Sequence, residues 1–242
     1  MTPLLAAVDA SAAWSDDDGR VHGFRRALDV VVASVALVAL APLLLVVALL
    51  VKATSPGPVF YRQTRVGLER RTSDRRAESI RSGPRDRRRR ERRAAPGHGY
   101  PFRIVKFRTM VADAEASGPR WSTQNDPRIT RIGRLLRATR LDETPQFWNV
   151  LRGDMSIVGP RPERPFFVDQ FVQRIPRYRE RLRVRPGITG QAQVTLAYDA
   201  SIDDVRRKLE QDLLWIEQRS VKRDLAILLR TVGVVLTGRG AR

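Results

Sequence analysis

The feature that most constrains this chain is a stretch of 22 uncharged residues, from Val30 to Val51. A helix of that length is about 33 Å long, enough to cross the hydrocarbon core of a bilayer. The stretch is apolar on every face, which disfavours a helix buried in a soluble core. It is also too long, and too far from Met1, for a cleaved signal peptide. We therefore predict a membrane-inserted segment over residues 24–56, after a disordered tail over residues 1–23.

Pro42 lies near the middle of the apolar stretch. It should kink or break the helix, because proline lacks a backbone donor and its ring clashes with the preceding turn. Two outcomes are compatible with this, a kinked span and a hairpin that enters and leaves by the same face. Arg25 and Arg26 precede the stretch and Lys52 follows it. Since cations flank both ends, the positive-inside rule favours neither orientation, as expected for a re-entrant hairpin.

The chain is strongly basic, with a formal net charge of +19, and 41 of its 45 basic residues are Arg. Such an excess indicates polyanionic partners, namely nucleic acid, an anionic membrane surface or phosphorylated substrates. The sequence contains no cysteine, which excludes disulfides and Cys-ligated metal sites. The two histidines, His22 and His98, each neighbour glycine, so a Ser-His-Asp triad is disfavoured. Catalysis would depend on carboxylates, Arg, Lys or a bound metal.

An Arg-rich segment interrupts what otherwise reads as a β-hairpin. Strands are predicted over Val59–Val66 and Pro101–Met110. Between them, residues 68–99 hold 12 Arg and 5 acidic residues, with only two large apolar side chains. Because such a composition cannot bury enough apolar surface to fold, we predict a disordered insertion. Its arginines would either hold an anionic membrane surface or form a solvated loop without function.

The remaining chain, residues 57–242, is predicted to form one domain, so that the fold class is α+β and mainly helical. A helix is predicted from Thr144, as N-cap, and Pro145, as first helical residue, to Gly153. Further helices are predicted after Asp126, over Pro165–Ile175, from Ile202, and over Val221–Leu236. The last of these is amphipathic, so it is either part of the core or a contact with the membrane interface.

The adjacent carboxylates of Asp142 and Glu143 are the strongest candidates for chemistry. They precede a predicted helix, where backbone N–H groups and the helix dipole favour negative charge. Arg137 and Arg140 lie close in sequence and should lower the pKa of a carboxylate, which then stays ionised as a nucleophile or metal ligand. Taken alone, the pair is explained more simply as a helix cap.

Cations elsewhere in the sequence favour a chemical role for the Asp142–Glu143 pair. Lys106 and Arg108 share one face of a predicted strand and would suit phosphate oxygens. Arg161 is presented by a stiff turn between Pro160 and Pro162. Together with the membrane segment, these residues predict an enzyme that moves a phosphate-bearing group at the bilayer surface.

Four ordered segments resemble the bacterial sugar transferases, which are monotopic polyprenyl-phosphate phosphoglycosyl transferases. The segments are Lys106–Met110, Asp142–Gln146, Asn149–Pro162 and Arg185–Gly190. The resemblance extends over about Gly23 to Arg242 apart from the insertion and fits the minimal form of the family. Where the family usually has Ser-Pro at the helix break, this chain has Ala41-Pro42, and it lacks the hydroxyl that could satisfy a freed carbonyl.

The resemblance implies transfer of a sugar-1-phosphate from a UDP-sugar to undecaprenyl phosphate, with release of UMP, in the first membrane step of exopolysaccharide or glycoconjugate assembly. It implies that Asp142 forms a covalent phosphosugar intermediate and that Glu143 binds Mg²⁺. It also implies a re-entrant helix in the bacterial inner membrane, amphipathic helices at the interface and a catalytic domain on the cytoplasmic face. The substrate-binding candidates are Lys106, Arg108, Arg137, Arg140, Gln146, Pro160, Arg161 and Pro162.

Two other functions remain open from the residues alone. A Mg²⁺-dependent phosphohydrolase would also use Asp142. A membrane-anchored, basic nucleic-acid-binding protein would explain the charge, but the insertion has no Phe, Tyr or Trp for base stacking. We therefore expect no nucleic-acid partner and assign the surplus positive charge to substrates and anionic lipid.

Overall fold

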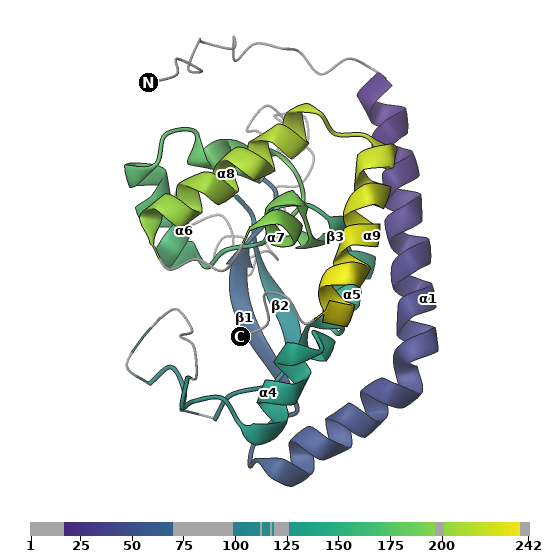
Figure 1. Ribbon diagram of the computed structural model, residues 1–242, viewed down its shortest axis with the longest axis vertical. Helices are drawn as coiled ribbons and strands as arrows, with labels where there is room; N and C mark the ends of the chain where they lie inside the picture. Colours follow the sequence, from purple (N-terminus) through teal and green to yellow (C-terminus); the bar gives the residue numbers. More distant parts are fainter. Residues whose placement is uncertain are drawn as a thin grey trace, which may run out of the picture.

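A long N-terminal helix lies along one side of a mainly helical domain in the computed structural model (Figure 1). The residues described are 17–69, 99–111, 113–116, 118, 126–196 and 201–237. The helix α1 (Asp17–Thr54) is followed by the strands β1 (Phe60–Val66) and β2 (Pro101–Phe107). The later elements are α4 (Arg131–Ala138), the 3₁₀ helix η1 (Leu141–Glu143), α5 (Gln146–Arg152), β3 (Ser156–Val158), α6 (Pro165–Arg174), the 3₁₀ helix η2 (Tyr178–Arg183), β4 (Gly187–Thr189), α7 (Gln191–Thr195), α8 (Ile202–Glu217) and α9 (Val221–Thr237).

The helix α1 contains the predicted membrane segment. It begins at Asp17, inside the predicted tail, and residues 1–16 lie outside the described residues. Pro42 lies within the helix without interrupting it, and Figure 1 shows α1 changing direction towards its C-terminal end. Of the two outcomes expected at Pro42, a kink and a break, the break is not observed, because α1 is continuous through this residue. Residues 23–54 are long and apolar enough to cross a membrane, and only 11% of their most apolar 18-residue window is buried.

Both ends of α1 are bonded to the domain. Near the N-terminal end, Arg26 donates hydrogen bonds of 2.6 and 2.9 Å to two carbonyls in the last turn of α5. Asp29 is buried and accepts a hydrogen bond of 2.9 Å from the backbone of β3. At the other end, Arg108 donates to the carbonyl of Ser55 at 2.7 Å. Between these two attachments, residues 34–46 include no buried side chain.

The predicted hairpin is confirmed. β1 and β2 pair antiparallel, with Phe60 opposite Phe107 and Val66 opposite Pro101. The ladder continues one step further, because the Gly67 amide donates to the carbonyl of Tyr100 at 2.9 Å. Residues 70–98 of the predicted insertion lie outside the described residues.

A side chain of α5 satisfies backbone groups of β2 on which no further strand among the described residues pairs. The Asn149 Oδ1 accepts a hydrogen bond from the Val105 amide at 3.0 Å, and its Nδ2 donates to the carbonyl of Arg103 at 2.8 Å. Asn149 is completely buried. The contact fixes α5, and the turn before it, against the strand that carries Lys106.

A second, parallel strand pair was not predicted. β3 pairs with β4, with Ser156 opposite Gly187 and Val158 opposite Thr189. Gly187 allows the backbones to approach closely, because a Cβ there would lie 2.1 Å from the amide nitrogen of Gly159. This close approach places the turn that follows β3 against the segment that leads into β4.

The helices α6, α8 and α9 begin where the sequence predicts, whereas α7 was not predicted. The apolar stripe of α6, which includes Phe167 and Phe171, is buried against η2 and α8. α9 is two-sided, with Ile227 almost fully buried in the core and its other side exposed. The exposed apolar residues of α9 are Val221, Leu225, Leu229, Val232 and Val235.

Candidate active site

The two candidate carboxylates lie in the short 3₁₀ helix η1, between α4 and α5. Asp142 is 7% exposed and Glu143 is 8% exposed. The chain enters η1 through Arg140, whose φ of 60° is a left-handed conformation uncommon for a residue other than glycine. The prediction that Thr144 caps α5 and that Pro145 is its first helical residue is wrong, because α5 begins at Gln146 with Pro145 as its N-cap. The Thr144 hydroxyl instead donates to the carbonyl of Leu141 at 2.7 Å. The carboxylates thus belong to a separate turn rather than to the first turn of α5.

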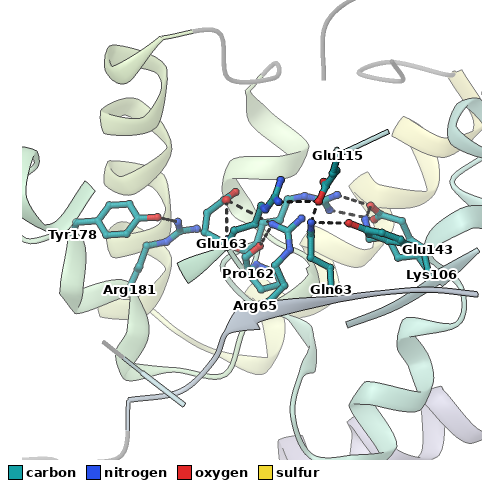
Figure 2. Close-up of polar contacts among 12 residues, drawn as sticks. Gln63, Arg65, Lys106, Glu115, Glu143, Pro162, Glu163, Tyr178 and Arg181 are labelled. Carbon is teal, nitrogen blue, oxygen red and sulfur yellow. Dashed lines mark hydrogen bonds and ion pairs between the residues drawn. The ribbon is translucent and has the colours of Figure 1, made fainter. Parts of the chain in front are cut away.

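Two predicted cations converge on Glu143. From β2, Lys106 Nζ lies 2.6 Å from Glu143 Oε1. From the turn after β3, Arg161 Nη1 donates to Oε2 at 3.1 Å, and Arg161 Nη2 donates to Oε1. The structure therefore brings together residues from three separate sequence motifs, and Figure 2 shows Lys106 beside Glu143.

The two carboxylates differ in pKa. Burial alone would raise the pKa of Glu143, but the charges and hydrogen bonds of Arg161 and Lys106 outweigh it and hold the pKa well below its usual value. Burial first, and then the negative charge of Glu143, raise the pKa of Asp142 to about 6. The prediction of a lowered pKa is therefore correct for Glu143 and wrong for Asp142. Asp142 is the more basic carboxylate and is mostly ionised at neutral pH.

The other predicted substrate-binding residues differ in position. The positive charge of Arg137 lowers the pKa of the Asp142 carboxyl, which shows that the two groups lie near each other. The Arg137 Nε donates a hydrogen bond to Thr109 Oγ1 at 3.0 Å. Arg108 is not part of the ion pairs on Glu143, since it is buried and donates to Ser55. The remaining candidates are Gln146, which is 1% exposed at the start of α5, Arg140 at the entry to η1, and Pro160 and Pro162 on either side of Arg161.

A polar network beside the site was not predicted. Gln63 on β1 donates to the hydroxyl of Tyr61 at 2.8 Å and to Glu115 at 3.2 Å, and Glu115 pairs with Arg164 at 3.0 Å. Tyr61 stands opposite Lys106 in the hairpin, which places this network next to the ion pairs on Glu143. Glu115 gave no sequence signal, because it lies in a loop without recognisable pattern.

The side chains that hold the Arg161 turn were also not predicted. Arg65 on β1 donates to the carbonyl of Pro162 at 3.0 Å, and Arg181 on η2 donates to the carbonyl of Arg161 at 3.0 Å. Figure 2 shows this row of contacts, from Glu143 and Lys106 at one end to Arg181 and Tyr178 at the other. In so basic a chain, no sequence pattern distinguishes these two arginines from the others.

The donor set limits how a metal could bind. Among the residues that the structure describes, no group of three or more His, Cys, Asp or Glu side chains could hold a metal ion. Two adjacent carboxylates are present, those of Asp142 and Glu143, and both oxygens of Glu143 are engaged by Lys106 and Arg161. Mg²⁺ is usually held by one or two protein carboxylates together with substrate phosphates. The residues therefore fit Mg²⁺ bound jointly with a phosphorylated substrate.

Comparisons with known proteins agree with these motifs. The family model for the bacterial sugar transferases matches residues 20–74 and 88–238. The gap in this match falls inside the predicted Arg-rich insertion. The matched residues include both carboxylates and the cations that converge on them.

Three relatives show how much is shared. Over 218 residues the chain is 42% identical to the UDP-N-acetylgalactosamine-undecaprenyl-phosphate N-acetylgalactosaminephosphotransferase of Aeromonas hydrophila, covering 90% of this chain and 45% of that protein. It is 40% identical over 215 residues to the UDP-glucose:undecaprenyl-phosphate glucose-1-phosphate transferase of Caulobacter vibrioides, covering 88% of this chain and 70% of the relative. It is 36% identical over 224 residues to the exopolysaccharide production protein PSS of Rhizobium leguminosarum bv. phaseoli, covering 89% of this chain and 97% of the relative.

The chain thus spans about half the length of the Aeromonas relative and nearly the whole of the Rhizobium one. Its long apolar helix agrees with a membrane-associated protein. From the extent of the family match and the identity to these relatives, the chain belongs to the bacterial sugar transferase family.

Proposed function

We propose that this protein is an undecaprenyl-phosphate sugar phosphotransferase. It transfers a sugar-1-phosphate from a UDP-sugar to undecaprenyl phosphate and releases UMP, as the first membrane step of exopolysaccharide or glycoconjugate assembly. The observation that carries the proposal is the buried pair Asp142–Glu143, with Lys106 and Arg161 converging on Glu143. The family relatives named for the same transfer support it.

In this mechanism Asp142 is the nucleophile. A carboxylate oxygen of Asp142 attacks the phosphorus bonded to the sugar, and the bond from that phosphorus to the UMP oxygen breaks. UMP leaves with the bonding electrons, and an aspartyl-phosphosugar remains. An oxygen of the lipid phosphate then attacks the same phosphorus and releases the Asp142 carboxylate. A pKa of about 6 suits this role, because the group is ionised at neutral pH and yet more basic than an ordinary aspartate.

The cations of the site stabilise charge that builds up on the phosphoryl oxygens. The Arg161 side chain is 34% exposed, so it can contact a bound nucleotide while its turn stays fixed. We assign the uridine nucleotide to Pro160, Arg161 and Pro162, and the phosphates to Lys106 and Arg137. Because the intermediate is covalent, the two polyanionic substrates visit the site in turn and never together.

We also propose that Mg²⁺ binds with the donor substrate at Glu143. When bound, the ion offsets pyrophosphate charge. Both oxygens of Glu143 are engaged by Lys106 and Arg161, so metal binding requires at least one of these ion pairs to open. The negative charge of Glu143 raises the pKa of Asp142, and a bound cation would neutralise that charge.

The attachments of α1 favour a re-entrant topology. A helix that spans the bilayer would place its ends on opposite sides, yet Arg26 and Ser55 are both bonded to the same domain. We infer that residues 34–46, which include Pro42, dip into the inner membrane from its cytoplasmic face. α9 lies beside α1 in Figure 1 and is joined to it by the Arg25–Asp224 ion pair at 3.2 Å. Its exposed apolar side would rest at the interface, and surplus arginines would bind anionic lipid.

The topology can be tested with two single-cysteine variants, since the natural sequence contains no cysteine. Ala27→Cys and Ala53→Cys place exposed thiols near the two ends of α1. We expect a membrane-impermeant maleimide to label both in inverted inner-membrane vesicles and neither in intact spheroplasts. Labelling of the two positions from opposite sides would show that the helix spans the bilayer.

The proposed activity is tested by incubating the purified protein in nanodiscs with a panel of UDP-sugars, with and without undecaprenyl phosphate. We expect UMP release that depends on the lipid and on one or a few sugars, together with a lipid-linked phosphosugar. Equal UMP release without lipid would instead identify a phosphohydrolase. Absence of UMP release with every donor would refute the proposed activity.

A further inference from the structure

The segment that carries Arg161 is held by an unusual set of hydrogen bonds. Residues 160–163 belong to no helix or strand, yet each of their four carbonyls accepts a hydrogen bond from elsewhere in the domain. The donors are the Gly187 amide to Pro160 (2.9 Å), Arg181 Nη2 to Arg161 (3.0 Å), Arg65 Nη1 to Pro162 (3.0 Å) and the Val66 amide to Glu163 (2.8 Å). Two of the four donors are therefore guanidinium groups, which come from β1 and η2.

Arg181 is itself fixed from two sides. It pairs with Asp212 of α8 at 2.8 Å, and its Nη1 donates to the hydroxyl of Tyr178 at 2.7 Å. The Arg181 side chain is 10% exposed and that of Asp212 is 2% exposed. A buried ion pair of this kind is costly to desolvate and is weak evidence for a role in stability alone. Its geometric effect is to aim Nη2 of Arg181 at the carbonyl of Arg161.

Arg65 holds the other half of the turn. It lies next to Val66 on β1, so two successive residues of one strand bind two successive carbonyls. Arg65 also pairs with Glu163 at 3.5 Å, and its side chain is 19% exposed. A cavity of about 10 Å³, lined among others by Pro160 and Tyr178, adjoins the turn.

We propose that Arg65 and Arg181, the second anchored by Asp212, are positioning residues that hold the backbone of the turn so that the Arg161 guanidinium stays aligned with Glu143. We call Arg65, Arg181 and Asp212 the clamp. The inference rests on the proposed function and extends it to residues remote from the reacting atoms. The Arg161 side chain is long and partly exposed, so a loose turn would let it sample many positions. A fixed backbone reduces the entropy lost when the guanidinium binds substrate.

The test uses substitutions that keep the positive charge and remove the several N–H donors of the guanidinium group. Arg65→Lys and Arg181→Lys each leave a single ammonium, which cannot reproduce the paired contacts of a guanidinium. We expect each to lower kcat/KM for the UDP-sugar by about 10- to 100-fold, within the range for misaligned catalytic groups. Matched controls are Arg62→Lys, on the exposed side of β1, and Arg183→Lys, whose side chain is 43% exposed on η2. Both controls should retain wild-type kcat/KM.

A double-mutant cycle shows whether the clamp acts through Arg161. In an Arg161→Ala background, Arg65→Lys and Arg181→Lys should change kcat/KM by less than about 3-fold, because residues that act as one unit are not additive. The same loss in both backgrounds, or wild-type activity in the single variants, would overturn the proposal. If Arg181→Lys fails to fold, Arg65→Lys decides the question, because it leaves the Arg181–Asp212 pair in place.

A second readout does not depend on catalysis. We expect hydrogen–deuterium exchange of peptides covering residues 159–164 to be faster in both clamp variants and unchanged in the controls. Unchanged exchange in the clamp variants would overturn the inference even if activity fell. If the wild-type protein itself shows no lipid-dependent UMP release, the proposed function fails, and the exchange measurement still decides whether the clamp holds the turn.

Discussion

Asp142→Asn is expected to abolish lipid-dependent UMP release, with turnover reduced by at least about 10³-fold, as for the loss of other covalent nucleophiles. The amide is nearly isosteric with the carboxylate but cannot form a stable bond to phosphorus. It also removes one of two adjacent buried negative charges, so the variant should fold at least as well as the wild type. The measurement is UMP release in nanodiscs, with sedimentation of membranes to verify that the variant stays bound.

Asp203→Asn is the matched control, because the Asp203 side chain is 79% exposed on α8. It should show wild-type turnover. Incubation with the UDP-sugar alone adds a second test, since the wild-type protein should gain the mass of a phosphosugar on the peptide containing Asp142. Substantial activity in Asp142→Asn, or an adduct on another residue, would falsify the assignment of the nucleophile.

Glu143→Gln is expected to have the next largest effect, a loss of about 10²- to 10³-fold in kcat/KM, comparable with the removal of one preorganised electrostatic contact. The neutral amide can no longer pair with Lys106 and Arg161, whose positions in the site depend on the carboxylate. The partly buried ammonium of Lys106 loses its nearest counter-charge, which should destabilise the fold by about 3 kcal/mol. Tm should fall by roughly 6–12 °C.

Stability and catalysis can be separated with a second variant. Lys106→Met combined with Glu143→Gln removes both charges, so it should recover much of the lost Tm while activity stays low. Glu210→Gln, at an exposed position of α8, is the control and should change neither quantity. Recovery of activity in the double variant would show that the carboxylate serves only the fold, and wild-type activity in Glu143→Gln would exclude it from the chemistry.

Local patterns predicted the long elements well. The hairpin was predicted over Val59–Val66 and Pro101–Met110 and is observed over Phe60–Val66 and Pro101–Phe107, so its second strand ends three residues early. The helices α8 and α9 begin at Ile202 and Val221, as their helical spacing indicates. These predictions succeed because the residues that form each element are neighbours in the sequence. The parallel pair of β3 and β4 was missed because each strand has three residues and its partner lies far along the chain.

The residues of the site also divide into those that local sequence patterns predict and those that only the folded structure reveals. Lys106, Glu143 and Arg161 were found because motifs mark them, and the structure brings them into contact. The raised pKa of Asp142 could not be anticipated, because nearby cations argue for a lowered pKa while the depth of burial is set by packing from the rest of the domain. Arg65 was missed for a related reason, since only the folded turn distinguishes it from the chain's other arginines.

The attachments of α1 also have a consequence for biosynthesis. The helix α1 is synthesised before its partners in the domain: Arg26 binds carbonyls of α5, and Arg25 pairs with Asp224 of α9. At ordinary rates of translation, about 10 to 40 s separate the synthesis of Arg25 from that of Asp224. Until α5 and α9 have been made, the contacts that hold the N-terminal part of α1 against the domain cannot form. The rest of the domain is therefore assembled against a helix that has already been synthesised.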